Sequence, residues 1–254
     1  MPLISIVTIT NNRRKYIAEA IESALSQSFA DWELIIIDDA SFDNTAEAVA
    51  KYTAQDKRIK FIRENINLGI TKARNLALRL AQGKYITVLD SDDIWADSNK
   101  LQKQYEFLEK NDDYVVVGGA VIVINENGKE VRRYKNPTTD TAIRAGILLR
   151  NPFLHSSVMF RRDAAVGCGG YGEYTVGEDY DLFLKMGWLG KLANTDDYLV
   201  KYRKHDFGIT WAKRVRAAKD HLSIIIKYKK QYPNYFFALI KGYLRLALSW
   251  ALSL

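Results

Sequence analysis

Short apolar segments alternate with segments of helical periodicity along the first part of this 254-residue chain. The apolar segments are rich in β-branched residues and are predicted strands: residues 3–10, 33–37, 59–63 and 85–89. Helices are predicted between them, over residues 13–27, 44–53 and 71–81. Such alternation at short spacing implies right-handed βαβ units, so we expect an α/β fold with a mostly parallel sheet and helices on both faces.

Residues 96–210 follow a less regular pattern. Strands are predicted over residues 115–118, 120–124 and 158–160, with a hairpin turn at the Asn-Glu-Asn-Gly segment 125–128. A short helix is predicted over residues 143–149, a glycine-rich loop over 167–177 and a further helix over 178–188. The sequence contains no internal repeat and no low-complexity linker, so it gives no sign of a second, separate domain.

Polar residues follow three of the predicted strands at their carboxyl ends. Thr10 ends the first strand, Asp38 and Asp39 follow the second, and the Asp-Ser-Asp-Asp segment 90–93 follows the fourth. Ligands of open α/β sheets bind beyond the carboxyl ends of the strands. We therefore expect these residues to line one crevice.

The acidic cluster Asp90, Asp92 and Asp93 places three carboxylates close together, where they repel one another unless a cation or solvent relieves the charge. Mg²⁺ and Mn²⁺ suit such a cluster, because they bind through one or two carboxylates and complete their coordination with phosphates and water. The alternative is an acidic turn that caps the following helix.

Composition limits the location and the partners of the protein. Cys168 is the only cysteine, which excludes an internal disulfide and favours a reducing compartment. The N-terminus has no basic segment followed by a long apolar stretch, so it is a predicted strand rather than a signal peptide, and we expect a cytoplasmic protein. The net charge of +7 is uneven, since residues 211–254 carry +8 and the rest carries −1. Such a basic segment attracts nucleic acid or anionic lipid.

The basic segment ends in an apolar helical pattern over residues 234–254. Lys241, Arg245 and Ser249 recur at every fourth position and form a narrow polar stripe. A cationic segment beside an amphipathic helix fits an anionic membrane surface. A transmembrane span is disfavoured, because Lys241 and Arg245 would lie near its centre. The alternative is a helix packed on the protein's own core or on a second subunit.

Seven segments together resemble a known family. They are residues 5–12, 35–41, 67–75, 89–93, 155–157, 177–181 and 202–205, and they occur in the family's order. Through them the chain resembles the family 2 glycosyltransferases of GT-A fold, nucleotide-sugar enzymes common in bacterial surface-polysaccharide synthesis. The resemblance implies a GT-A domain over residues 1–210, with a nucleotide-binding half at 1–95 and an acceptor-side half at 96–210. The basic helical tail, residues 211–254, lies outside it.

The resemblance also implies roles for residues of the nucleotide-binding half. Asp39 is expected to accept a hydrogen bond from the nucleotide base, with Thr8 and Thr10 lining the base pocket. The alternative role of Asp39 is to cap the helix that follows it. Lys72 and Arg74 lie near the start of a predicted helix, where they could meet the ribose or the diphosphate.

The acidic cluster resembles the family's DxD pair. By this resemblance Asp90 meets the ribose, with Ser91 beside it in the nucleotide-sugar site. Asp92 ligates the Mn²⁺ or Mg²⁺ ion that bridges the donor phosphates and stabilises the departing nucleoside diphosphate. His205 resembles a late histidine of the family that approaches the metal or the diphosphate, and Arg203 could neutralise phosphate.

Asp179 is the candidate general base. Glycosyl transfer with inversion needs a carboxylate on the acceptor side, opposite the leaving phosphate, to take the proton of the acceptor hydroxyl. Glu178 and Asp179 resemble the family's ED motif, in which the Asp has that role. The alternative is that both acids only interact with the dipole of the helix that they begin. Asp181, two residues further on, remains a competing candidate.

The leading interpretation is a metal-dependent inverting glycosyltransferase that uses a nucleotide sugar, with UDP favoured, and a glycan or polyprenyl-diphosphate-linked acceptor. We expect its tail to dock on the inner face of the cell membrane. An alternative is a non-catalytic nucleotide-sugar-binding or scaffold protein of the same fold. Nucleic-acid binding is disfavoured, because the basic charge lies beside an apolar helix and not among stacking aromatic residues on a sheet.

Overall fold

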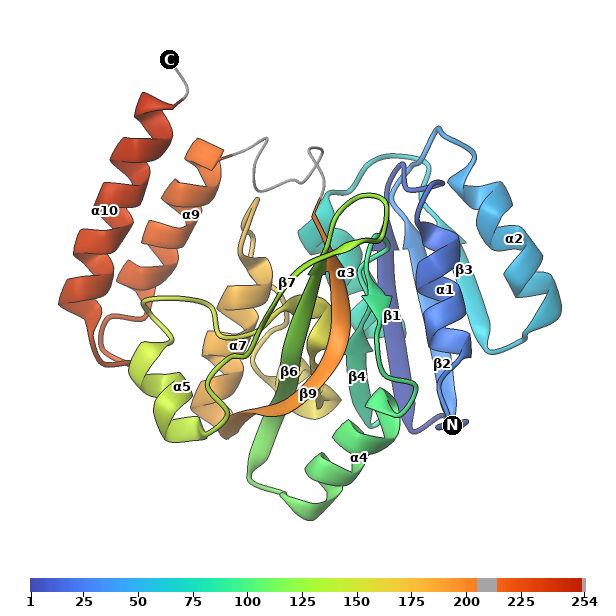
Figure 1. Ribbon diagram of the computed structural model, residues 1–254, viewed down its shortest axis with the longest axis horizontal. Coiled ribbons are helices and arrows are strands. Elements are labelled where there is room, and N and C mark those ends of the chain that lie inside the picture. The colour runs from blue at the N-terminus through green and yellow to red at the C-terminus, as the bar shows by residue number, and fades with distance from the viewer. Residues whose placement is uncertain (205–213, 253–254) are drawn as a thin grey trace.

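The computed structural model describes residues 1–204 and 214–252, in which helices flank a curved mixed sheet (Figure 1). The strands are β1 Ile4–Thr10, β2 Trp32–Asp38, β3 Ile59–Arg63, β4 Tyr85–Val88, β5 Ile94–Trp95, β6 Tyr114–Ile124, β7 Glu130–Tyr134, β8 Met159–Arg161 and β9 Lys191–Arg203. The helices are α1 Ile17–Leu25, α2 Thr45–Gln55, α3 Ile70–Leu80, α4 Lys100–Lys110, α5 Asp140–Gly146, α6 Arg162–Gly167, α7 Glu178–Leu189, α9 Arg214–Lys227 and α10 Tyr235–Ala251, with the 3₁₀ turn η1 at His155–Ser157. The strand order is β3-β2-β1-β4-β8-β6-β9-β5, with β7 paired to β6.

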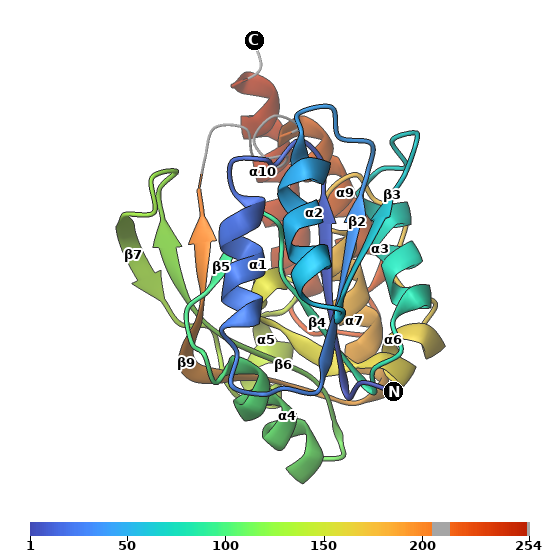
Figure 2. The same cartoon turned by 90° about the vertical axis from the view of Figure 1, so that its right-hand side faces the viewer.

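The first half of the sheet is parallel, as the sequence predicts. β1 pairs in parallel with β2 and β4, and β2 pairs in parallel with β3. Helices cover both faces of these strands (Figure 2), so every position of β1 and β2 is buried and apolar residues occupy most of them. Alternate residues of β1 enter two cores, since Ile4 and Ile6 pack with α1, whereas Val7 and Ile9 pack with α3.

The second half of the sheet is mixed. β8 pairs antiparallel with both β4 and β6, and β6 pairs in parallel with β9. Residues 115–118 and 120–124, predicted as two strands, belong to the single strand β6, whose register with β9 shifts between Gly118 and Ala120. The predicted hairpin turn at residues 125–128 is confirmed, because it joins β6 to the antiparallel strand β7 and ends at Gly128 with a φ of 81°.

Sequence periodicity did not reveal β5, β7, β9, α4 or α6, and α4 illustrates the reason. Its buried face carries Lys100 and Gln104 beside Leu101 and Leu108. Lys100 Nζ donates hydrogen bonds to Thr87 Oγ1 at 2.7 Å and to Gln104 Oε1 at 2.8 Å. Burial holds the pKa of Lys100 well below its ordinary value. Polar residues thus occupy positions where an apolar pattern would have indicated a helix.

The C-terminal helices α9 and α10 lie side by side at one end of the molecule, next to α7 (Figure 1). Asp181 of α7 is fully buried and accepts hydrogen bonds from Lys227 Nζ at 2.7 Å and Tyr228 Oη at 2.8 Å. α10 packs closely on α9, since a Cβ atom at Gly242 would lie 2.9 Å from a Leu222 methyl group. The tail therefore contacts the core, as the alternative interpretation expected. Within the described ranges, none of the helices combines the length and apolarity that a bilayer span requires.

Candidate active site

A cavity of about 1550 Å³ opens at the carboxyl ends of β1, β2 and β4, and α10 forms part of its wall. Sequence-predicted site residues that line it are Thr10, Asp39, Lys72, Arg74, Asp90, Ser91, Asp92 and Asp179. Thr8 is not among the described lining residues, because it is buried on the face of β1 that α1 covers. His205 lies outside the described residues. The three polar strand ends thus share one space, as the topology predicts.

Asp39 connects the end of β2 to the loop before α3. Its carboxylate is buried and accepts hydrogen bonds from the backbone N–H groups of Leu68, at 2.6 Å, and Gly69, at 3.0 Å. It does not cap α2, whose N-cap residue is Asn44, so the capping alternative is wrong. Thr10 lies nearby, and its buried hydroxyl has no hydrogen-bond partner among the described residues. Both residues keep acceptor capacity on the cavity, which the predicted base-binding role requires.

Arg74 joins two carboxylates that come from different elements of the cavity wall. Its buried guanidinium donates a hydrogen bond to Asp90 Oδ1 at 3.0 Å and a second one to Glu178 Oε1. Burial raises the pKa of Glu178 above its ordinary value even though the charge of Arg74 opposes that shift. Carboxylates thus engage two of the guanidinium nitrogens, so Arg74 holds α3, the segment after β4 and α7 together around the cavity.

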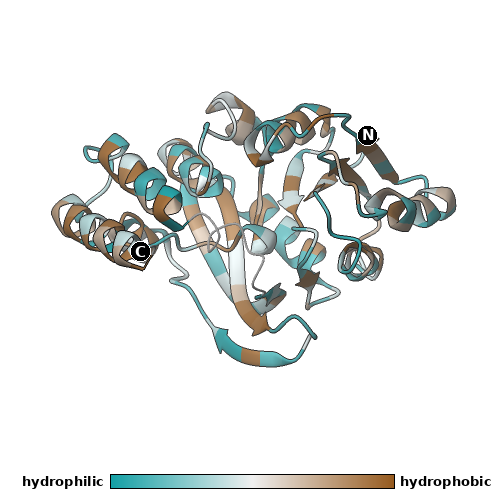
Figure 3. Ribbon diagram, turned by 90° about the horizontal axis from the view of Figure 1, so that it is seen from above, coloured by the Kyte–Doolittle hydropathy of each residue, from teal (hydrophilic) through white to brown (hydrophobic). Residues whose placement is uncertain are grey.

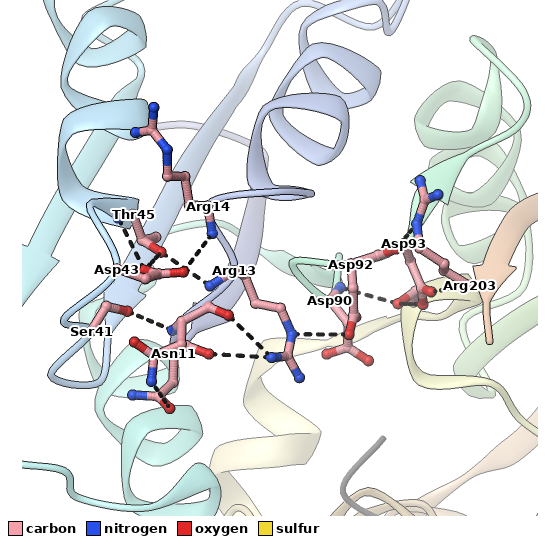
Figure 4. A network of polar contacts seen from close by, with 12 residues as sticks. Asn11, Arg13, Arg14, Ser41, Asp43, Thr45, Asp90, Asp92, Asp93 and Arg203 are labelled. Carbon is pink, nitrogen blue, oxygen red and sulfur yellow. Dashed lines mark hydrogen bonds and ion pairs between the residues drawn. The ribbon is translucent and has the colours of Figure 1, made fainter. Parts of the chain in front are cut away.

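The two acids of the DxD pair have different partners (Figure 4). Burial alone would raise the pKa of Asp90, but Arg74 and His155 lower it below its ordinary value, so Asp90 is ionised at neutral pH. Asp92 accepts a hydrogen bond from Arg13 Nε at 3.2 Å. Arg13 was not among the predicted site residues, because nothing in its local motif indicates a contact with the acidic cluster.

Asp93 points away from its two acidic neighbours and supports the loop. It is buried, and it accepts hydrogen bonds from the Ser156 hydroxyl and from the backbone N–H of Arg203 at 2.9 Å. Burial and the charges of Asp92 and Asp90 raise the pKa of Asp93 well above its ordinary value. The Arg203 side chain is also engaged, since it donates to Glu19 Oε2 at 2.8 Å and to the Asp92 carbonyl at 3.0 Å. Arg203 therefore stabilises this loop.

The chemistry of these residues fits a divalent cation that also binds phosphate. Within residues 1–204 and 214–252, no three His, Cys, Asp or Glu side chains are grouped so that they could hold a metal by themselves. Asp90 and Asp92 nevertheless present carboxylate oxygens to the cavity, and both are partly exposed. Mg²⁺ and Mn²⁺ are commonly bound by one or two carboxylates together with substrate phosphates and water. Asp92 would hold the ion in that way, with Asp90 beside it.

Asp179 differs from the other two acids in the first turn of α7. Glu178 is paired with Arg74, and Asp181 is buried beneath α9. Asp179 is partly exposed and lines the cavity, and it accepts a hydrogen bond of 3.3 Å from Asn151 Nδ2. Among these three acids, it is the one that has no ion pair within the described part of the chain. Asn151, which no sequence motif identified, thus orients the candidate base.

Comparison with known proteins identifies the family. The model of the family described as "Glycosyl transferase family 2" matches residues 5–169. An uncharacterized glycosyltransferase of Haemophilus influenzae is 32% identical over 220 residues, which are 80% of this chain and 66% of the relative. The putative glycosyltransferase EpsE of Bacillus subtilis is 36% identical over 210 residues, 80% of this chain and 73% of EpsE. The UDP-Glc:alpha-D-GlcNAc-diphosphoundecaprenol beta-1,3-glucosyltransferase WfgD of Escherichia coli is 39% identical over 125 residues, 49% of this chain and 48% of WfgD.

Solved structures share the fold at lower identity. The structure of S. aureus TarS in complex with UDP-GlcNAc matches with a TM-score of 0.72 and 20% sequence identity. The match covers 95% of this chain and 72% of the TarS chain. The structure of the mannosyltransferase PcManGT from Pyrobaculum calidifontis in complex with GDP-Man and Mn²⁺ matches with a TM-score of 0.71 and 18% sequence identity. The match covers 98% of this chain and 75% of the PcManGT chain. These likenesses establish the GT-A fold, and the family match establishes the enzyme class. The chain belongs to glycosyl transferase family 2 and is a glycosyltransferase.

Proposed function

We propose that this enzyme transfers a sugar, with inversion, from a UDP-sugar to a hydroxyl group of a glycan or polyprenyl-diphosphate-linked acceptor in surface-polysaccharide biosynthesis. The observation that carries the proposal is that the DxD acids and Asp179 line one cavity from different elements, the end of β4 and the start of α7. The relatives add support, because WfgD is named for a UDP-Glc donor and a diphosphoundecaprenol acceptor, and TarS is seen with UDP-GlcNAc.

In the proposed reaction, Asp179 accepts the proton of the acceptor hydroxyl. The hydroxyl oxygen forms a bond to the anomeric carbon while the bond from that carbon to the diphosphate oxygen breaks. Asn151 keeps the Asp179 carboxylate oriented through its hydrogen bond. Asp92 would hold Mn²⁺ or Mg²⁺ beside the diphosphate, and Asp90 would meet the ribose. When bound, the ion supplies Lewis-acid stabilisation of the charge that develops on the leaving group.

Calorimetric titration of UDP, GDP and dTDP, first with Mn²⁺ and then with EDTA, tests the donor site. We expect UDP to bind with Mn²⁺ and to bind at least about tenfold more weakly with EDTA, because the ion joins the phosphates to Asp92. Asp92→Ala should abolish the effect of Mn²⁺. The matched variant Asp112→Ala removes a highly exposed carboxylate outside the cavity and should bind UDP like the wild type.

Two other results would change the proposal. If the folded protein binds none of the three nucleotides, the proposed reaction is wrong. If it prefers GDP or dTDP to UDP, only the donor class must be corrected. PcManGT has the same fold and was solved with GDP-Man, so the fold alone does not select UDP.

The tail would dock this enzyme on an anionic membrane surface, where a polyprenyl-linked acceptor would reside. α10 packs on α9 through a narrow face of small residues, and hydrophobic residues recur along its whole length (Figure 3). Its exposed large apolar residues are Phe236, Phe237, Ile240, Tyr243, Leu244, Leu248 and Trp250. A contiguous apolar surface flanked by basic residues is typical of helices that lie in the membrane interface.

Substitution of exposed apolar residues tests the tail better than its removal, because α9 also packs on the core. Phe236→Ser/Phe237→Ser is expected to weaken binding to phosphatidylglycerol vesicles by about tenfold or more, since two phenyl rings no longer enter the lipid. Vesicle sedimentation measures the change. Phe42→Ser/Ile66→Ser removes two apolar side chains elsewhere that are even more exposed and should have no effect. Unchanged vesicle binding of the tail variant would contradict membrane docking through α10.

A further inference from the structure

A second cavity, of about 360 Å³, adjoins the candidate base and lies among α7, α9, α10 and the segment that follows α5. Asp179 and Asn151 line both this cavity and the larger one. The two spaces therefore meet at the candidate base. The donor site described above does not use this cavity, whose wall includes helices of the tail, outside the segments that match the family.

Three cationic side chains line the second cavity: Arg150, Lys241 and Arg245. Lys241 and Arg245 lie one turn apart on α10, a spacing at which like charges oppose helix formation. Within the described residues, none of the three forms an ion pair with a carboxylate, and Lys241 Nζ donates to the Leu149 carbonyl at 3.0 Å. Asp179 is the one carboxylate among the described lining residues of this cavity, and Lys241 and Arg245 also line the larger cavity. An excess of positive charge that is gathered from two segments attracts an anion.

His221 lies in the same cavity and responds to this charge. Its ring stacks on Tyr180, with ring centroids 5.4 Å apart and an interplanar angle of 23°. Burial, together with the charges of Arg245 and Lys241, lowers the pKa of His221 to about 4. The histidine is therefore neutral at pH 7, and the positive charge of the cavity comes from the arginine and lysine side chains.

The surroundings of the cations indicate the kind of anion. Arginine binds phosphate through paired hydrogen bonds and lysine through a point charge, so two or three such residues suit a multiply charged phosphate group. Leu244 and Leu248 lie one and three positions from Arg245 on α10, where they are exposed and line the larger cavity. An apolar chain attached to the phosphate would therefore find an apolar surface beside the cations.

We propose that the second cavity binds the diphosphate of a prenyl-diphosphate-linked acceptor, with the prenyl chain along the exposed apolar side of α10 and the attached sugar directed toward Asp179. This inference rests on the proposed function and adds the site that recognises the lipid diphosphate. It gives the tail a part in substrate recognition, because two of the three cations belong to α10. The donor diphosphate has its own place, at Asp90 and Asp92.

Calorimetric titration of farnesyl diphosphate into the full chain, in EDTA, tests this site, because donor binding is expected to need metal. Lys241→Gln/Arg245→Gln should weaken binding by at least about tenfold, since charge-assisted hydrogen bonds to phosphate are lost. Lys229→Gln/Lys230→Gln removes the same charge from exposed positions outside both cavities and should change binding by less than about twofold. Inorganic pyrophosphate, which lacks the apolar chain, should bind more weakly than farnesyl diphosphate.

Several outcomes would overturn the proposal. The first is that Lys241→Gln/Arg245→Gln binds farnesyl diphosphate like the wild type. The second is that the control Lys229→Gln/Lys230→Gln loses binding to the same extent. The third is that Asp92→Ala loses binding. If Lys241→Gln/Arg245→Gln loses binding to phosphatidylglycerol vesicles but still binds farnesyl diphosphate, Lys241 and Arg245 bind lipid headgroups instead. Arg150→Gln leaves the tail intact, so it decides the question if Lys241→Gln/Arg245→Gln does not fold. Weaker binding of farnesyl diphosphate by Arg150→Gln supports the site, and unchanged binding overturns it.

The donor titration separates this inference from the proposed function. If none of UDP, GDP and dTDP binds with Mn²⁺ but farnesyl diphosphate binding still depends on Lys241 and Arg245, the proposed reaction is wrong and the anion site stands. If UDP binds as expected and Lys241→Gln/Arg245→Gln binds farnesyl diphosphate like the wild type, only the diphosphate site in the second cavity is wrong.

Discussion

Asp179→Asn is expected to lower kcat by about 10²–10⁴-fold and to leave the Kd for UDP unchanged, because an amide of the same shape cannot accept the proton of the acceptor hydroxyl. Asp179 belongs to the first turn of α7, whereas the nucleotide is expected at the ends of β1, β2 and β4. Release of UDP in the presence of acceptor measures kcat, and calorimetry with Mn²⁺ measures the Kd. The two measurements separate the loss of a base from the loss of the donor site.

Glu173→Gln is the matched control for this variant. Glu173 is an exposed acid that also lines the cavity, so its removal changes the local charge by the same amount, and kcat should stay near that of the wild type. Near-normal turnover by Asp179→Asn would contradict the assignment. Glu178 and Asp181 would then have to be considered, although the first is paired with Arg74 and the second with Lys227.

The parallel half of the fold could be predicted from sequence, because its signals are local. β3 has the predicted bounds of residues 59–63, and the tail helix was predicted over 234–254 and observed as α10. β9 was missed because the polar residues 194–197 interrupt its apolar pattern, and its pairing with β6 makes it a strand. β7 is almost entirely exposed, so it has no buried face that a pattern could indicate.

The site could be predicted in outline for a different reason. Parallel topology brings the strand ends together, whichever residues follow them, so motifs at those ends were expected to meet. The partners of these residues could not be predicted, because they come from distant parts of the chain. Arg13 reaches Asp92 across 79 positions, and Arg74 reaches Glu178 across 104. Asn151 belongs to no motif and is identified only by its contact with Asp179.

Asp181→Ala is expected to lower the free energy of unfolding by about 3 kcal/mol, near the lower end of the range for a broken buried ion pair because Lys227 reaches solvent. Asp181 is fully buried, and its carboxylate interacts with Lys185 and Lys227 Nζ at 2.8 and 2.7 Å. The variant also leaves the buried Tyr228 hydroxyl without this acceptor. Urea unfolding followed by circular dichroism measures the change.

Asp113→Ala is the matched control, since Asp113 forms an ion pair of 2.6 Å with Lys191 in which both side chains are about half exposed. Its unfolding midpoint should equal that of the wild type, because solvent screens exposed pairs. Unchanged stability of Asp181→Ala would mean that apolar contacts alone hold the tail. A less stable tail should also weaken acceptor binding, because α10 lines both cavities. We expect Asp181→Ala to bind acceptor less well even at temperatures where most molecules remain folded. Asp181, which was the competing candidate for the general base, would then affect the reaction by holding the tail in position.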